Sequence, residues 1–228
     1  MTETLTPKQH FVVMDVDSTL IEEEVIDLIA EIAGVGPQIS AITEKAMRGD
    51  IDFHEALAQR VSMLAGVPTT VFLRVLSRVH FTPGALKLVR TAHKRGWKVG
   101  VVSGGFHEIV DTLVAQAGID FSLANRLEVT SGTDSTVSTL TGRTAGPVVD
   151  KSLKLATLTS WVHSLGLELS DAVALGDGAN DIPMLQAAGL GIAFCAKPVV
   201  REAVSHHIDT RNLMQAIDII DAWDAQER

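Results

Sequence analysis

The sequence predicts an α/β protein with a Rossmann-like parallel sheet and an inserted small α-helical cap. Short apolar runs of strand length alternate with helical stretches, the order typical of parallel strands joined by covering helices. One region, from about Glu22 to Ser77, breaks this alternation because it contains helical patterns and no convincing strand. We therefore expect a core formed by residues 1–20 and 79–228 and a cap formed by residues 21–78.

Four apolar segments have the length and composition of buried strands. They are FVVM (11–14), WKVGVVSGG (97–105), DAVALGDG (171–178) and GLGIAF (189–194). Continuous apolar runs of this kind are typical of strands in a parallel sheet covered on both faces. Residues 126–143 also have a β-like pattern, which favours a hairpin.

Helical periodicity fills the spaces between these strands. The four helical stretches of the core are 83–96, 106–118, 154–166 and 180–189, and each ends in glycine, a residue common just past a helix terminus. In the cap, Val25, Leu28, Ile29 and Ile32 have the spacing of a helix with one apolar face. Three similar stretches follow before residue 80, so we expect the cap to be helical.

Composition limits the class of protein. The 228 residues are 46% hydrophobic, enough for one sizeable core or a core with a small insertion, and the net charge of −9 disfavours non-specific binding to nucleic acid or anionic membranes. A single cysteine, Cys195, fits a reducing compartment, and neither a signal peptide nor a membrane span is predicted. We expect a cytoplasmic protein; an anionic small-molecule substrate is compatible with the negative net charge if a metal or local positive charge is present, and the sequence does not distinguish a monomer from a dimer.

Acidic residues gather where two of the predicted strands end. Asp15 and Asp17 follow the first strand with the spacing that places both side chains on one side, and Asp177 follows the third. Ligands of open α/β sheets bind beyond the carboxyl ends of strands. Three carboxylates without a His or Cys cluster favour Mg²⁺, with Asp181 as a ligand or as an orienting group for bound waters. The alternative is an Asp pair that only caps its loop.

A phosphate site is a second hypothesis. Ser103, Gly104 and Gly105 follow the second predicted strand and precede a helix, so a hydroxyl and backbone N–H groups could approach an anion there. An ordinary strand-to-helix turn explains these residues equally well. A phosphate beside acids also needs a cationic side chain, and Lys151 and Lys154 are both candidates that spacing alone does not separate.

Together these motifs resemble those of a known superfamily. DVDST (15–19), then Ser103, then a lysine, then GDGAND (176–181) are similar to the four ordered motifs of the haloacid dehalogenase superfamily. The resemblance is greatest to its phosphoserine phosphatase family. It is carried by VDSTLIEEEVIDLIAEIAG, AMRGDIDFHEALAQRVSMLAG, VVSGGF and GDGANDIPML, and it runs from about residue 13 to residue 194, with a looser match around 126–143.

The resemblance implies catalytic and metal-binding roles. Asp15 would be the nucleophile and would have to be ionised, whereas Asp17 would start protonated as general acid and later act as general base. Mg²⁺ would be held by Asp15, the Asp17 backbone carbonyl and Asp177, with Asp181 behind them.

It also implies substrate-binding residues. Lys154 is favoured over Lys151 because it lies four residues after Asp150. Glu24 would bind an ammonium group and Arg60 a carboxylate, which arginine can bind in a bidentate manner; without the resemblance, both could be solvated surface residues. The full implied set is Glu24, Met47, Phe53, Arg60, Ser103, Gly104, Lys154 and Asn180.

The implied activity is Mg²⁺-dependent hydrolysis of O-phospho-L-serine to L-serine and phosphate through an aspartyl-phosphate, the last step of L-serine biosynthesis. One alternative is a phosphatase or phosphotransferase acting on another small phosphorylated amino acid, such as phosphohomoserine or phosphothreonine. A phospho-accepting receiver module is an alternative of another class. The single-residue spacing of Asp15 and Asp17 and the inserted helical block weigh against it.

Overall fold

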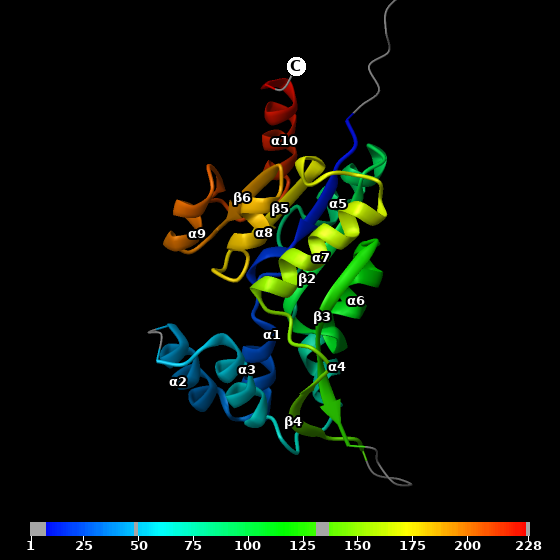
Figure 1. Ribbon diagram of the computed structural model, residues 1–228. Helices are drawn as coiled ribbons and strands as arrows, with labels where there is room; N and C mark the ends of the chain where they lie inside the picture. Colours follow the sequence, from blue (N-terminus) through cyan, green and yellow to red (C-terminus); the bar gives the residue numbers. More distant parts are fainter. Residues whose placement is uncertain (1–7, 48–49, 131–136, 227–228) are drawn as a thin grey trace, which may run out of the picture.

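The structure, a computed structural model, describes residues 8–47, 50–130 and 137–226 (Figure 1). Its centre is a seven-stranded sheet in the order β4-β3-β2-β1-β5-β6-β7. Neighbouring strands pair in parallel except β3 and β4, which are antiparallel. The strands are β1 (Phe11–Met14), β2 (Lys98–Phe106), β3 (Phe121–Val129), β4 (Leu140–Ala145), β5 (Ala172–Gly176), β6 (Leu190–Phe194) and β7 (His206–Ile208). The predicted α/β fold class is confirmed.

Helices cover both faces of the sheet. Because successive side chains of a strand point to opposite faces, Val12 and Met14 join one apolar core while Phe11 and Val13 join a second. This arrangement explains why β1 is uniformly apolar. The first core is covered by α5 (Ala85–Lys94), α6 (His107–Ala117) and α10 (Gln215–Gln226). The second is covered by α7 (Lys151–Ser164), α8 (Ile182–Ala187) and α9 (Pro198–Ala203).

The helical insertion lies in the chain between β1 and α5, beyond the carboxyl end of β1 (Figure 1). Its helices are α1 (Val25–Ala33), α2 (Gly36–Met47), α3 (Phe53–Ser62) and α4 (Val71–Leu76). Helix α1 ends at Gly34, whose φ of 77° is a left-handed conformation that glycine adopts without strain. Buried residues of α1 and α3 belong to the same apolar cluster as the α5 face of the sheet, so the helical insertion and the sheet share a continuous core.

Two sets of backbone hydrogen bonds attach the helical insertion to the sheet region. At its base, residues 20–22 bond residues 80–82, with Ile21 and Phe81 forming an antiparallel bridge. Farther along, residues 66–69 bond residues 138–140 at the start of β4, through N···O distances of 2.8–2.9 Å. The insertion is therefore attached both at its base, where residues 20–22 meet residues 80–82, and to the β3–β4 pair.

Some elements were not expected from the sequence. The first half of β3 pairs in parallel with β2, and β7 extends the sheet beyond β6. Both strands are partly exposed and lack the continuous apolar run that predicts a buried strand. The expected hairpin corresponds to β3 and β4, but its tip falls at 131–136, outside the described residues. No helix in the described ranges combines the length and apolar character needed to cross a membrane.

Candidate active site

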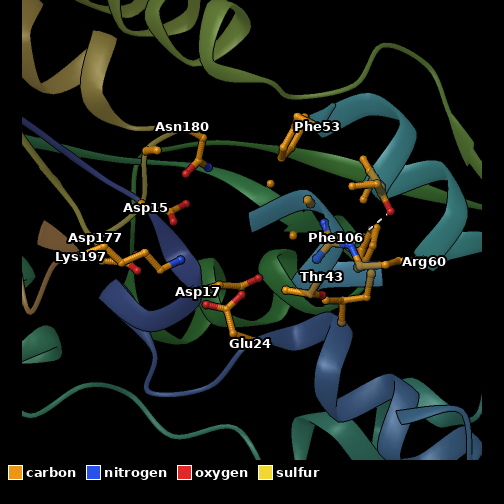
Figure 2. A pocket seen from close by; sticks show the side chains of 18 of the residues that line it. Asp15, Asp17, Glu24, Thr43, Phe53, Arg60, Phe106, Asp177, Asn180 and Lys197 are labelled. Atoms are coloured by element: carbon orange, nitrogen blue, oxygen red, sulfur yellow. Dashed lines mark hydrogen bonds between the residues drawn. The ribbon is translucent and has the colours of Figure 1, made fainter. Parts of the chain in front are cut away.

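A cavity of about 330 Å³ lies where β1, β2 and β5 end and the helical insertion begins. One side is built by residues that follow the strands, and the other by residues of α1–α3 (Figure 2). From the sheet side the lining includes Asp15, Asp17, Gly104, Gly105, Asp177, Asn180 and Lys197. From the insertion it includes Glu24, Thr43, Phe53 and Arg60.

The end of β1 presents Asp15 and Asp17 at this cavity. The Asp15 amide donates to the Leu175 carbonyl of β5 at 3.0 Å, which extends the sheet by one residue. The chain then turns sharply at Ser18, whose φ of 57° is uncommon for a residue with a side chain. Both carboxylates are almost fully buried, at 6% and 9% exposed. The sequence therefore places two acids at the end of an apolar strand, where both are buried and line the cavity.

At the end of β2, Gly105 lies close to the side chains of Asp17 and Ser103. A Cβ atom there would lie 3.0 Å from Asp17 Oδ2 and 3.0 Å from Ser103 Oγ, so a side chain would crowd the acid. The buried Ser103 hydroxyl accepts the Gly105 N–H at 2.8 Å, and the Asn125 amide donates to the Gly104 carbonyl at 2.8 Å. These bonds fix the backbone at the cavity wall. Binding of phosphate by Ser103 and Gly104 stays a prediction.

Lys154 lies among the acids and Lys151 does not. The Lys154 Nζ donates to Asp15 Oδ1 and to Asp181 Oδ1, both at 2.7 Å, and its side chain is completely buried. Lys151 is exposed at the first turn of α7. The Asp150 carboxylate caps this helix by accepting two backbone N–H bonds, which fixes the start of the helix that carries Lys154.

Three buried carboxylates form a group that could hold a cation. Oxygens of Asp15, Asp177 and Asp181 all lie within 4.8 Å of one another. Asp181 already accepts from Lys154 and, at 3.0 Å, from the Gly178 N–H, so both of its oxygens are engaged. The group is thus better suited to direct coordination by Asp15 and Asp177, with Asp181 held behind them. An all-oxygen set of this kind fits a hard divalent cation such as Mg²⁺.

Burial and the neighbouring carboxylates raise the pKa of Asp15 and of Asp177. Burial, opposed by Lys154 and reinforced by the Asp181 and Asp177 carboxylates, raises the pKa of Asp15 to about 8. Burial together with Asp181 and Glu24 raises the pKa of Asp177 to about 6. A pKa of about 8 means that, without a compensating cation, the Asp15 carboxyl retains its proton at neutral pH. An ionised nucleophile at Asp15 therefore needs positive charge beyond that of Lys154.

Asp17 differs from Asp15 in its partners. Its Oδ1 atom is buried and has no hydrogen-bond partner among the described residues. Burial, then Glu24 and Asp15, raise the pKa of Asp17 well above its usual range. A protonated Asp17 carboxyl could donate from this site, which is the direction expected for a general acid.

The side of the cavity formed by the helical insertion carries one acidic residue, Glu24, and one basic residue, Arg60. Glu24, directly before α1, accepts a 2.7 Å hydrogen bond from the Ser18 hydroxyl. Arg60 is half-buried on α3, and burial lowers the pKa of its guanidinium. Phe53 begins α3 and forms an apolar wall. Met47 is the last residue of α2, and its side chain lies outside the described part of the structure.

Comparison with known proteins identifies the family. The family model of haloacid dehalogenase-like hydrolases matches residues 12–186, which include the acids of β1 and β5, Ser103 and Lys154. The chain belongs to this family.

Phosphoserine phosphatases are similar over most of this hydrolase. The one from Lactococcus lactis subsp. lactis is 56% identical over 92% of this chain and 94% of its own, and the one from Streptococcus thermophilus is 53% identical over the same shares. A solved phospho-aspartyl intermediate analogue of phosphoserine phosphatase is 39% identical, with a TM-score of 0.85, over 93% of this chain and 99% of that one. A substrate-bound phosphoserine phosphatase complex is 38% identical, also at 0.85, over 93% and 98%.

Residues missed by the sequence analysis also line the cavity of this hydrolase. Lys197 follows β6, and Thr43 projects from α2. A lysine three residues past the predicted strand GLGIAF could have been found, because the carboxyl end of that strand lies at the same edge of the sheet. The position of Thr43 could not be predicted, because helical periodicity alone does not show which polar residues of a helix line a cavity.

Proposed function

We propose that this protein hydrolyses O-phospho-L-serine to L-serine and phosphate. The observation that carries the proposal is the two-sided cavity. Its sheet side holds a buried Asp15 bonded to Lys154, and its other side holds Glu24 and Arg60. A phosphorylated amino acid has a matching distribution of groups, with a phosphate at one end and an ammonium and a carboxylate at the other. The similarity to phosphoserine phosphatases over most of the chain supports the same substrate.

In the first step, an Asp15 carboxylate oxygen attacks phosphorus and the bond from phosphorus to the serine oxygen breaks. Asp17 donates its proton to that oxygen, so serine leaves as a neutral alcohol. The raised pKa of Asp17 and its unpaired Oδ1 support this role. Lys154, bonded to Asp15 and Asp181, keeps the nucleophile oriented toward the cavity.

In the second step, the ionised Asp17 accepts a proton from water, and the resulting hydroxide oxygen attacks the phosphorus of the aspartyl-phosphate. The bond from phosphorus to Asp15 breaks, which releases inorganic phosphate and restores the carboxylate. Asp15, the Asp17 backbone carbonyl and Asp177 would hold Mg²⁺, with Asp181 behind them. When bound, the ion neutralises phosphoryl charge and favours an ionised Asp15.

Substrate identity depends on the helical insertion, which we propose to be a cap domain of residues 21–78 on a core of residues 1–20 and 79–228. Glu24 would bind the substrate ammonium and Arg60 its carboxylate, with Met47 and Phe53 as apolar walls. The phosphate end would be bound by Ser103, Gly104, Lys154 and Asn180.

We also infer that the protein acts in the cytoplasm, in L-serine biosynthesis.

Phosphate release from a panel of esters tests the function. We expect phosphoserine, with Mg²⁺, to give a kcat/KM at least about tenfold above phosphothreonine, because a single extra methyl group can cost that much in a fitted pocket. Phosphohomoserine and a phosphate monoester without an amino acid moiety complete the panel. Preference for either phosphohomoserine or phosphothreonine would replace the proposed substrate, and no hydrolysis of any ester would remove the proposed activity.

A further inference from the structure

The cavity is lined by a lysine, Lys197, whose role is unassigned. Among the described residues that line it, only Arg60 and Lys197 are basic. Arg60 belongs to α3, whereas Lys197 lies on the side of the cavity formed by Asp177 (Figure 2). Lys197 is exposed and makes no ion pair within 4.0 Å with any residue of the described ranges. Lys154 contrasts with it, since two of its three N–H groups are already committed to carboxylates.

A turn after β6 and two backbone hydrogen bonds fix the position of Lys197 at the cavity. Beyond β6 the chain turns at Cys195, whose φ of 44° is one of two positive values among the described non-glycine residues. The Cys195 amide donates to the Ile208 carbonyl at 2.7 Å, and the Lys197 amide donates to the Asp177 carbonyl at 3.2 Å. Side chains in this left-handed conformation are uncommon and gather at functional sites. The other such residue, Ser18, follows the catalytic acids directly.

We propose that Lys197 is a substrate-binding residue that contacts the phosphate group, both in the bound ester and in the released product. This inference rests on the proposed phosphatase function of the same cavity. The lining carries the acids Asp15, Asp17, Glu24 and Asp177, a poor environment for a phosphate dianion unless further positive charge is present. Lysine supplies a mobile point charge with three donors, which suits a phosphate that arrives, reacts and leaves.

A competing role is compensation of Asp177 alone. The Lys197 charge lies near enough to lower the pKa of the Asp177 carboxyl, although burial outweighs it. If that were its purpose, removing the charge would change cation affinity and leave phosphate affinity at a fixed, saturating Mg²⁺ concentration unchanged. The two roles are therefore separable by measuring phosphate and Mg²⁺ binding independently.

The test compares Lys197→Gln with Lys197→Arg and with Lys151→Gln, an exposed lysine on α7 that does not line the cavity. Calorimetry measures the Kd of inorganic phosphate at saturating Mg²⁺, and a steady-state assay gives KM and kcat for phosphoserine. For Lys197→Gln we expect phosphate Kd and phosphoserine KM to rise together by about tenfold, the scale of one charge-assisted hydrogen bond, with kcat within about threefold. Lys197→Arg should recover most of the affinity, and Lys151→Gln should match the parent protein.

An unchanged phosphate Kd in Lys197→Gln would overturn the proposal, as would a change seen only in the Mg²⁺ concentration needed for half-saturation. Because the phosphate titration contains no ester, its outcome does not depend on which ester is the true substrate. A wrong substrate assignment would appear in the ester panel, whereas a wrong role for Lys197 would appear in the phosphate titration.

Discussion

The two sides of the cavity differ in how firmly their residues are held. On the sheet side, Lys154 is completely buried and its ammonium bridges Asp15 and Asp181 through 2.7 Å bonds. On the insertion side, Arg60 is half-buried, and its Nε donates to the Ala56 carbonyl of its own helix at 3.3 Å. Parts of a site that perform the same chemistry on every substrate need fixed geometry, whereas parts that distinguish substrates can vary.

One side-chain contact near the cavity, between His54 and Asp150, also joins the insertion to the sheet side. His54 Nε2 of α3 lies 3.2 Å from Asp150 Oδ2, at the start of the helix that carries Lys154. The histidine side chain is 59% exposed, so this pair contributes little to stability. This exposed pair therefore adds little to the attachment of the insertion, which is held by the shared apolar core and by the backbone hydrogen bonds at residues 20–22 and at β4.

The largest expected effect comes from replacing Asp15, the proposed nucleophile on the sheet side. Asp15→Asn should lower phosphate release by about 10⁴-fold or more, because the covalent step loses its attacking carboxylate and an amide oxygen is a poor nucleophile. The assay is phosphate release from phosphoserine with Mg²⁺, with circular dichroism to check folding. Asp218→Asn, at an exposed acid of α10, is the matched control and should keep full activity. Turnover near the parent level in Asp15→Asn would refute the nucleophile assignment.

A substitution on the opposite side should have a smaller and more selective effect. Arg60→Ala should lower kcat/KM for phosphoserine by about 10- to 100-fold, the loss of charge-assisted hydrogen bonds to a carboxylate. A phosphate ester without a carboxylate should lose much less. Arg74→Ala, an exposed arginine of α4 in the same insertion, is the control. Equal losses for both esters would remove Arg60 from carboxylate recognition.

The smallest predicted effect is a pH dependence of the unfolding free energy, caused by the buried acids on the sheet side of the cavity. The raised pKa values of Asp15, about 8, and Asp177, about 6, mean that the folded protein binds more protons than the unfolded chain above pH 4 or so. Unfolding free energy of the metal-free protein should therefore fall as pH rises from about 5 to about 8, by at least about 2 kcal/mol. Urea unfolding measures it.

Mg²⁺ should oppose this fall, because protons and the cation compete for the same carboxylates. Its stabilising effect should be larger at about pH 8 than at about pH 5. Asp177→Asn should show a shallower pH dependence without metal, which would assign part of the fall to this acid. Stability that rises with pH in the metal-free parent would contradict the assignment of these shifts.

Most of the sheet side could be predicted from sequence because a local rule determines it. Apolar strands of a parallel sheet end at one edge, so Asp15, Asp17 and Asp177 had to lie near each other. The choice of Lys154 over Lys151 could not be made from spacing, because it depends on where Asp150 starts α7 and on the rotation of that helix over the sheet. The close fit at Gly105 also could not be predicted, because a Cβ atom there would lie 3.0 Å from Asp17 Oδ2, which belongs to a segment far away in the chain.

The double attachment of the helical insertion determines which segment could be exchanged between related enzymes. Residues 66–69 and 138–140 share backbone hydrogen bonds, so the insertion and the β3–β4 pair form one structural unit even though about 70 residues separate them in sequence. A chimera that replaces residues 21–78 alone would leave polar backbone groups at the start of β4 facing a foreign loop. Moving β3 and β4 together with the helices would keep those bonds, so new substrate preferences would be introduced with two chain segments instead of one.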